Sequence, residues 1–475
     1  MNRLLNKVRE LPKGAKASIA FFFSTLCTKG IAYLTTPFYT RLLTTAEYGQ
    51  VSVYLTWVQI FGIVAMFSFM NGVFNNGMVD FPNKRNEFTF SLLVLSNIIT
   101  LAFGLVIFLI FPIIRKYLNM DYPLLILMFL IFLFQPAQSF WMARQRYELK
   151  YKLPLLISVS SALFSSLSAV ICLFLINRNG VYERLFGAEV VLICFYLAFY
   201  IVVGIKNKWR INIEYWKYAI LFNLPLIPHY LSTYLLSSSD KIMISRLVGD
   251  TEAGIYSIAV SIASIALIVW TAINASLVPF TYEKCKTGEY DKISRVTKPL
   301  LFVFSLGCIF VIMLAPEAVR LISTKDYLDA IYVIPPIVGG VFFQVQYYIY
   351  ANIVYYHKKP IYVMIASVSA TILNISLNYL LIPKLGYRAA GYTTIVSYCF
   401  QAAIDFLAMR KITKTNVYDI RYVLILSAFV TVTAVMAPLF YHISFLRYEI
   451  VSLILLFGLL SRKKIFKKVM GFKNE

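Results

Sequence analysis

About fourteen long apolar runs divide this sequence, and they constrain the fold more than any other feature. Most have about 18 or more residues, the length that an α-helix needs to cross the hydrocarbon core of a bilayer. Hydrophobic residues make up 60% of the chain and charged residues 14%, so one water-soluble core cannot bury this apolar surface. We therefore predict an all-α polytopic membrane protein with about 14 transmembrane helices. Their approximate limits are 17–36, 51–70, 88–111, 124–141, 155–176, 185–205, 218–237, 253–279, 300–314, 331–348, 361–382, 389–409, 423–440 and 443–460.

The loops between these runs differ in positive charge. Those on the side of the N-terminus carry about 32 Lys and Arg residues, and those on the other side about 12. Because such a bias in short loops sets orientation, we expect both termini in the cytoplasm and the protein in the bacterial inner membrane. The net charge of +23 is then explained by topology and anionic lipid headgroups, and no nucleic-acid partner is predicted.

Several classes of function are disfavoured. The six cysteines are scattered and form no Cys/His cluster, so we predict no metal site and no cofactor. The longest predicted loop, 280–299, has no room for a nucleotide-binding domain, and no GxxxxGK[ST] motif occurs. The acidic residues are few and dispersed, whereas a membrane-embedded glycosyl transferase or polymerase needs clustered carboxylates. We therefore predict a transporter and not an enzyme, driven by an ion gradient, the membrane potential or removal of product.

An internal repeat organises the chain. The segment Arg41–Gly49 reads RLLTTAEYG, and Arg246–Gly254 reads RLVGDTEAG, about 205 residues later. Arg, Leu, Glu and Gly recur in them at identical spacing. Three more pairs have nearly the same offset: Gln138 with Gln344, Pro154 with Pro360, and Gly180 with Gly386. Four agreements at one offset indicate a duplicated structural unit.

The repeat predicts a domain organisation. An N-terminal segment (1–14) precedes an N-lobe (15–210) and a C-lobe (211–410) of six spans each, an extra two-span hairpin (411–461) and a basic tail (462–475). Each lobe has an even number of spans, so both share one orientation and are related by a pseudo-two-fold axis along the membrane normal. In transporters built this way the substrate path runs between the lobes.

Three groups of short motifs resemble those of O-antigen and polysaccharide flippases (Wzx-like), in that family's order. They are RLLTTAEYG (41–49); NLPLIPH (223–229), SDKIMISR (239–246) and AGIYS (253–257); and NISLN (374–378), LIPKLG (381–386) and AAGY (389–392). Each motif is short, but together they cover most of the chain. The family belongs to the multidrug/oligosaccharidyl-lipid/polysaccharide exporter superfamily.

This resemblance implies a V-shaped two-lobed fold and a function. The expected function is to flip a polyprenyl-diphosphate-linked oligosaccharide by alternating access during surface polysaccharide synthesis, with a polysaccharide polymerase and a chain-length regulator as partners. The extra hairpin resembles that of the lipid II flippase branch, where added spans border a groove for the lipid tail. The alternative is a multidrug-type cation antiporter of the same fold, which would be expected to carry an acid where Lys29 stands.

Two ionisable residues lie deep in predicted spans. Lys29 is roughly 18 Å from the start of its span, where a lipid-facing ammonium is unfavourable; we expect it to bind the diphosphate. Snorkelling or pairing with a carboxylate stays the alternative. His229 follows Pro225 and Pro228, which interrupt helical hydrogen bonding, and is a second substrate-binding candidate. The alternative is a neutral core histidine.

Repeat-related residues supply further substrate-binding candidates, Arg41 with Arg246 and Gln138 with Gln344. The arginines could ring the outer mouth, but pairing with Glu47 and Glu252 in the loops is the alternative that we favour. The glutamines offer the neutral hydrogen-bonding groups that sugars need, but interhelical hydrogen bonds account for many such residues.

The remaining candidates concern coupling and access from the cytoplasm. For H⁺ or Na⁺ coupling or for gating they are Asp240, Lys241, Glu189 and Asp405; for the cytoplasmic approach of the diphosphate they are Arg144, Arg146, Lys150 and Lys152. Glu189 is expected about one turn inside the outer end of its span, and Asp405 about one turn inside the inner end of its own. Interfacial ion pairing and positive-inside topology are the respective alternatives.

Overall fold

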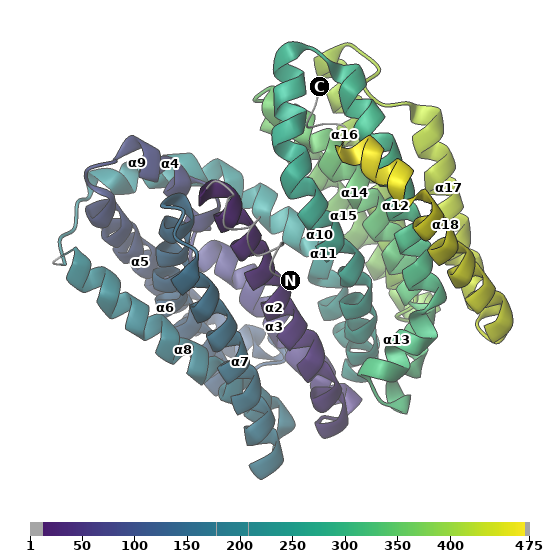
Figure 1. Ribbon diagram of the computed structural model, residues 1–475. Helices are drawn as coiled ribbons and strands as arrows, with labels where there is room; N and C mark the ends of the chain where they lie inside the picture. Colours follow the sequence, from purple (N-terminus) through teal and green to yellow (C-terminus); the bar gives the residue numbers. More distant parts are fainter. Residues whose placement is uncertain (1–12, 177, 208, 471–475) are drawn as a thin grey trace, which may run out of the picture. The chain divides into compact units, whose positions relative to one another are not determined.

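The computed structural model describes residues 13–176, 178–207 and 209–470, and within them every regular element is a helix (Figure 1). This confirms the all-α fold class. Two compact units divide between Tyr234 and Leu235. Unit 1 contains α2 (Lys13–Leu42), α3 (Thr45–Ala65), η1 (Phe69–Asn71), α4 (Val73–Asp80), α5 (Arg85–Leu118), α6 (Tyr122–Tyr147), α7 (Lys152–Leu175), α8 (Gly180–Lys206), α9 (Glu214–Asn223) and η2 (Leu224–Leu226).

Unit 2 starts within α10 (Ile227–Leu247), the helix in which the division lies. It continues with α11 (Asp250–Thr287), α12 (Tyr290–Met313), α13 (Ala315–Ile322), η3 (Lys325–Tyr332), α14 (Ile334–Tyr356), α15 (Pro360–Leu385), α16 (Ala389–Thr413), α17 (Ile420–Met436), η4 (Ala437–Phe440) and α18 (Ser444–Met470). Residues 1–12 of the predicted N-terminal segment and 471–475 of the predicted tail lie outside the described residues.

The fourteen predicted spans all coincide with helices. Within the described ranges, eleven helices have both the length and the apolar composition of a membrane span. One of these runs from α9 through η2 into α10. The other three predicted spans lie on α3, α16 and α18. The chain is therefore a multi-pass membrane protein.

The prediction of a long loop at residues 280–299 is wrong. The structure continues α11 to Thr287 and begins α12 at Tyr290, so only Gly288 and Glu289 lie between them. Charged residues ended the apolar runs in this region, but polar residues outside the bilayer extend helices equally well.

Ion pairs hold the short turn between α11 and α12. Hydrogen bonds from Lys292 (2.6 Å) and Lys284 (3.1 Å) lower the pKa of the Glu289 carboxyl to about 2.

The sequence repeat reappears in the helix boundaries. The end of α2 and the start of α3 recur 205 residues later, as the end of α10 and the start of α11. Before α3, Thr44 and Glu47 form a capping box: the Thr44 hydroxyl accepts from the Glu47 N–H (3.2 Å), and the Glu47 carboxylate accepts from the Thr44 N–H (2.9 Å). Gly249 stands in the position of Thr44 before α11, so the second copy has no such cap.

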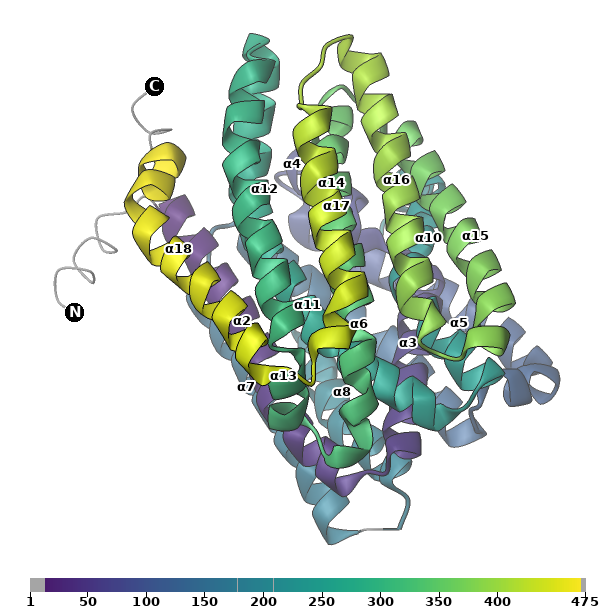
Figure 2. The same cartoon turned by 90° about the vertical axis from the view of Figure 1, so that its right-hand side faces the viewer.

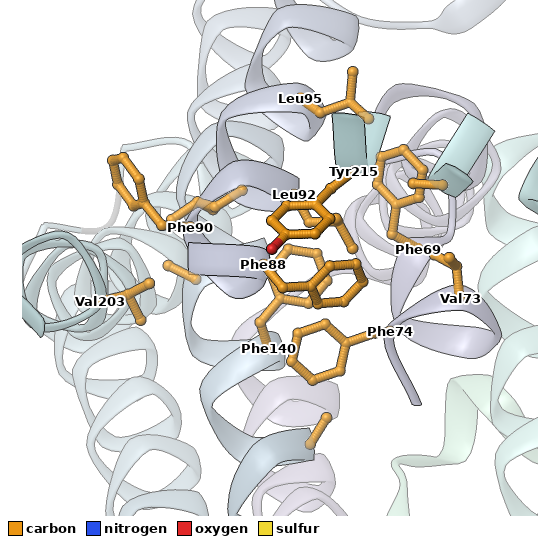
Figure 3. Packing of buried hydrophobic residues seen from close by; sticks show 14 of the residues in the cluster. Phe69, Val73, Phe74, Phe88, Phe90, Leu92, Leu95, Phe140, Val203 and Tyr215 are labelled. Carbon is orange, nitrogen blue, oxygen red and sulfur yellow. The ribbon is translucent and has the colours of Figure 1, made fainter. Parts of the chain in front are cut away.

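Unit 1 has an aromatic core that joins α4, α5, α6 and α9 (Figure 3). The Phe74 and Phe140 rings stack with centroids 4.8 Å apart, and Tyr215 meets Phe88 edge to face at 5.3 Å. Gly77 lies against the Phe88 ring, where an added Cβ would be 2.1 Å from the nearest ring atom. The absence of a side chain at Gly77 thus allows α4 to pack on α5.

The proline-rich segment ahead of His229 interrupts helical structure as expected. Leu224–Leu226 forms a 3₁₀ turn between α9 and α10. The buried Asn223 side chain donates to the Phe67 carbonyl (2.7 Å) and accepts from the Val73 N–H (3.4 Å), which ties α9 to unit 1. The compact units consequently divide later than residues 210 and 211, and the lobe boundary drawn from the repeat stays a prediction.

In unit 2, α14 is the central helix. Nearly all of its residues are buried, and it packs against α11, α12, α15, α16 and α17. Figure 2 shows α14, α15, α16 and α17 running side by side. The Gln346 amide donates to the Ser427 hydroxyl (2.8 Å), joining α17, the first helix of the predicted hairpin, to this centre.

Arg447 fastens the second hairpin helix, α18, to unit 2. Its side chain is 2% exposed. The guanidinium donates to the Met313 carbonyl (3.0 Å) and to the Glu317 carboxylate (2.7 Å), and the Tyr448 hydroxyl donates to the same carboxylate (2.9 Å). A buried guanidinium is stable only with such partners, so this contact fixes the position of α18 on α12 and α13.

We expect Arg447→Ala to destabilise the attachment of α18 by about 1.5–3 kcal/mol, the contribution of hydrogen bonds to a charged group. Thermal unfolding of the purified chain in detergent, followed by tryptophan fluorescence, measures the effect. Arg421→Ala is the matched control, because Arg421 is an exposed arginine at the start of α17. Equal unfolding temperatures for the two variants would contradict the role given to Arg447.

Candidate functional site

A cavity of about 490 Å³ lies within unit 1 between α2, α6, α7 and α8. Its wall is rich in hydroxyl and amide groups, whereas a second cavity of about 370 Å³ between α5 and α6 is lined by hydrocarbon apart from Thr100. Concave surfaces with a few convergent polar groups are the usual ligand sites. The neutral polar side chains of the wall, beside the Tyr196 phenol, are Thr28, Gln135, Gln138, Ser139, Ser158, Ser161, Ser165 and Ser166.

Helix α7 supplies most of the hydroxyls because its serines recur on one face. Ser158, Ser161 and Ser165 are spaced by three and four residues, so they project in the same direction. The hydroxyls of Ser161 and Ser165 donate to carbonyls of their own helix at 3.2 Å, which leaves their oxygens able to accept. Sequence reasoning missed these residues, although their spacing was visible.

Four cytoplasmic cations were predicted to act together, and the structure separates them. Arg144 and Lys150 bond to Glu148 at 2.8 and 2.6 Å, and Arg144 also donates to the Asn86 amide oxygen. Burial raises the pKa of Glu148, but hydrogen bonds from Lys150 and Arg144 outweigh it and hold that pKa below its usual range. These two cations therefore share one carboxylate, which offsets half of their combined charge.

Arg146 differs from its neighbours because it lines the cavity. Its guanidinium lies over the Phe21 ring of α2 at 5.3 Å, which leaves its N–H groups able to donate to a ligand. Lys152 is exposed and lies outside the cavity wall. Among the predicted site residues, Arg146 and Gln138 therefore both line the cavity, eight residues apart on α6.

Lys29 is exposed on α2, immediately after Thr28 of the cavity wall. Within the described part of the chain it forms no ion pair, so the alternative of a carboxylate partner is not observed. Its binding of diphosphate stays a prediction.

Glu189 lies deeper in its helix than expected. Helix α8 begins at Gly180, five residues before the predicted span, so Glu189 is about two and a half turns inside it. The carboxylate lies close enough to the Tyr54 and Tyr196 hydroxyls to act on them electrostatically, and the charge of Arg184 acts on it. Tyr196 lines the cavity, whereas Glu189 is not among the lining residues.

In unit 2, Asp240 is the centre of a buried polar network. Its carboxylate, 2% exposed, accepts hydrogen bonds from the Tyr256 hydroxyl (2.6 Å), the Asn378 amide (2.6 Å) and the Thr394 hydroxyl (3.0 Å). The Asn378 amide also reaches the Asn374 oxygen at 3.2 Å. These partners come from α11, α15 and α16, so the network joins four helices.

The neighbouring Lys241 is half-buried and makes no ion pair with Asp240 within the described residues. Every hydrogen-bond donor to the carboxylate is neutral. Lys241 acts on the carboxylate electrostatically, but the mutual ion pair that was the alternative for these two residues is not observed, since consecutive residues of a helix point in directions 100° apart. The carboxylate is left able to bind one proton or one monovalent cation.

The other predicted residues lie apart from these two sites. The Arg41 guanidinium donates to the Pro37 carbonyl of its own helix (2.8 Å), and Glu47, which caps α3, accepts from the Gly180 N–H (3.2 Å). The pairing of Arg41 with Glu47 is therefore not observed. His229 is half-buried in the first turn of α10, Arg246 lies in the last turn of α10, Gln344 is buried on α14, and Asp405 is buried on α16.

Sequence reasoning also missed the partners of Asp240. Tyr256, Asn374 and Asn378 stood inside motifs quoted for the family resemblance, but nothing in their spacing linked them to Asp240, which is 138 residues before Asn378. A signal existed in the asparagines themselves, because two amides one turn apart in an apolar span need polar partners.

The sequence matches two family models and is similar to two proteins of Haemophilus influenzae. The family model described as "Polysaccharide biosynthesis protein" matches residues 15–283, and the model "MatE" matches residues 225–380. The Haemophilus influenzae "Lsg locus putative protein 1" is 27% identical over 202 residues, 42% of this chain and 50% of that protein. The chain thus matches half the length of that relative. An "uncharacterized membrane protein" of the same organism is 21% identical over 370 residues, 75% of this chain and 88% of that protein.

Two solved structures that share this fold are a lipid flippase and a multidrug transporter. The lipid II flippase MurJ in an inward closed conformation aligns with a TM-score of 0.67 at 16% identity, over 95% of this chain and all of that chain. An inward-facing multidrug resistance MATE transporter of the MOP superfamily gives a TM-score of 0.61 at 13% identity, over 81% and 94%. At such identities the likeness shows the fold alone. Since the family model covers more than half of the sequence, the chain belongs to the polysaccharide biosynthesis protein family.

Proposed function

We propose that the chain flips a polyprenyl-diphosphate-linked oligosaccharide from the cytoplasmic to the outer leaflet of the bacterial inner membrane by alternating access, with both termini in the cytoplasm. The observation that carries this proposal is the cavity of unit 1, in which serine, threonine and glutamine side chains accompany a single arginine. The family membership supports it. The chain would act in O-antigen or capsule assembly beside a polymerase and a chain-length regulator, and would itself catalyse no reaction.

The cavity suits the head of such a substrate. Sugar hydroxyls both donate and accept hydrogen bonds, and serine, threonine and glutamine side chains do the same. The diphosphate needs charge-assisted donors, and the Arg146 guanidinium has the fork geometry that binds phosphate oxygens in pairs. The polyprenyl tail would stay in lipid, where apolar surface is stable.

The MATE-like fold keeps a drug exporter as the competing function. An organic cation would require a carboxylate in the binding cavity. Among the described residues the cavity wall contributes Arg146 and no Asp or Glu. Glu189 is not among the lining residues, and the charge of Arg184 acts on it. The charge of the cavity therefore favours an anionic substrate.

We further propose that Asp240 couples transport to H⁺ or Na⁺. A proton would bind a carboxylate oxygen, and Na⁺ would find oxygen ligands on Asp240 and on Thr394, whose hydroxyl lies 3.0 Å from the carboxylate. Glu189 is the corresponding candidate in unit 1. Either ion would change the charge of a buried site, which is the kind of change that biases two conformations.

Reconstitution without nucleotide tests the function. Proteoliposomes would contain an undecaprenyl-diphosphate-linked oligosaccharide, and an external glycosidase would report the fraction of sugar that becomes accessible. We expect protein-dependent flipping without ATP and no uptake of a fluorescent organic cation. Uptake of the cation without flipping of the lipid-linked sugar would replace the flippase by the drug exporter.

A further inference from the structure

Asp405 is a buried acid of α16 that the network of Asp240 does not include. Its side chain is 0% exposed, and neither carboxyl oxygen has a hydrogen-bond partner within the described residues. An ionised carboxylate without partners is strongly unfavourable in a dry protein interior. The carboxyl therefore carries a proton in this conformation, or reaches water, and both states imply exchange with solvent at some stage.

Asp405 forms no ion pair with any residue that the structure describes. From α14 the titratable side chain close enough to interact with it is Tyr347, whose own neighbours are Tyr348 and Tyr355. Helix α15 packs along α16, and the Thr393 hydroxyl donates to the Asn378 amide oxygen between them. On α16 itself, Lys411 lies over the Tyr362 ring at 5.7 Å.

A polar stripe on α16 connects Asp405 with the Asp240 network. At intervals of three or four residues, one face of this helix carries Thr394, Ser397 or Tyr398, Gln401 and Asp405, all buried. Thr394 donates to Asp240 at 3.0 Å, and the Gln401 amide oxygen also has no partner among the described residues. The stripe is about 16 Å long at 1.5 Å per residue. Unpartnered buried polar atoms in such a line are sites for ordered water.

We propose that Asp405 is a proton-exchanging carboxyl that connects Asp240 with solvent along this stripe. In each exchange the O–H bond of the Asp405 carboxyl breaks and its proton passes to water, leaving a carboxylate; a proton from water at the other side then restores the acid. The proposal goes beyond the transported substrate, because it concerns a proton route within unit 2. It also assigns H⁺, and not Na⁺, to the coupling step.

Infrared difference spectroscopy of the full chain in lipid nanodiscs tests the proton without any substrate. We expect the wild type at neutral pH to show the C=O band of a protonated carboxyl, part of which Asp405→Asn removes. Glu283→Gln, which removes an exposed acid of α11, should leave the band unchanged. A band of the same intensity in Asp405→Asn would overturn the proposal.

Transport tests the route. In proteoliposomes containing the lipid-linked sugar, an imposed pH gradient should change the flipping rate of the wild type but not that of Asp405→Asn or Asp405→Leu. Leucine is included because an apolar side chain suits this buried position even if the asparagine variant folds poorly. If the flipping rate of either folded variant still responds to the pH gradient, the proposed proton route is wrong. Absence of flipping by the wild type, with its infrared band intact, would instead refute the proposed function alone.

Discussion

Arg146→Ala is expected to weaken capture of the lipid-linked sugar by about tenfold to a hundredfold. Loss of charge-assisted hydrogen bonds to a diphosphate corresponds to about 1.5–3 kcal/mol, and about 1.4 kcal/mol is one decade in affinity. The guanidinium lines the hydroxyl-rich cavity and is stacked on Phe21, so its donors are available to the ligand. The substrate concentration that gives half-maximal flipping in proteoliposomes is the measurement.

Lys152→Ala is the matched control, since it removes one cytoplasmic cation that is exposed and outside the cavity wall. Its half-saturating concentration should equal that of the wild type. Arg146→Lys should fall between Arg146→Ala and wild type, because the charge is kept and the fork geometry is lost. Equal weakening by Arg146→Ala and Lys152→Ala would show that the arginine acts through general surface charge and binds no phosphate.

Lys29 gives an independent test of the same cationic cavity. The sequence predicts that Lys29→Ala weakens capture by about tenfold to a hundredfold, because this ammonium is expected to bind the diphosphate. Lys29 lies beside Thr28 of the cavity wall but not in it. If Lys29→Ala behaves as wild type while Arg146→Ala does not, the phosphate is held from α6, and the deep lysine is not a ligand.

The fold was largely predictable because its determinants are local. Apolar length located the spans, and the two copies of the repeated RL…E.G pattern fall at equivalent helix boundaries, between α2 and α3 and between α10 and α11. The prediction failed where helices extend beyond the bilayer, as in the segment 280–299. An apolar run marks only the part of a helix inside the hydrocarbon core of the membrane, whereas the hydrogen-bonded helix can continue past it.

The site was less predictable, because it depends on contacts between distant segments. Four cations after the fourth predicted span look alike in sequence, yet Glu148 pairs with Arg144 and Lys150, whereas Arg146 lines the cavity. In the same way Asp240 was recognised as a buried acid, but its partner Thr394 lies 154 residues later. Such pairings are set by helix packing, which single-sequence patterns do not encode.

The two units carry different chemistry, although the sequence repeat relates segments of one to segments of the other. Gln138 lines the polar cavity of unit 1, whereas its repeat counterpart Gln344 is buried on the central helix of unit 2. Conversely, the buried carboxylate network occurs around Asp240 in unit 2. We infer from this asymmetry that unit 1 binds the substrate head and unit 2 binds the coupling ion. A substitution in one unit should then remove one of these two roles and leave the other.

Asp240→Asn is expected to abolish the response of flipping to an imposed ion gradient. The amide can neither gain a proton nor supply the negative charge that a monovalent cation needs. It also directs N–H groups toward neighbours that already donate (the Tyr256 and Thr394 hydroxyls and the Asn378 amide). One buried donor then loses its acceptor, which destabilises unit 2 by about 1–3 kcal/mol. The ratio of flipping rates with and without the gradient is the measurement for coupling, and thermal unfolding in detergent is the measurement for stability.

Asn352→Ala separates these two effects, because it removes a different buried polar contact of the same unit. The Asn352 amide donates to the Asn274 oxygen at 2.9 Å and has no hydrogen bond to Asp240. We expect this variant to lose a similar amount of stability but to keep the gradient response of the wild type. Loss of the response in both variants would mean that coupling depends on the general packing of unit 2. A normal response in Asp240→Asn would remove Asp240 from the coupling mechanism and leave its network a structural link between α10, α11, α15 and α16.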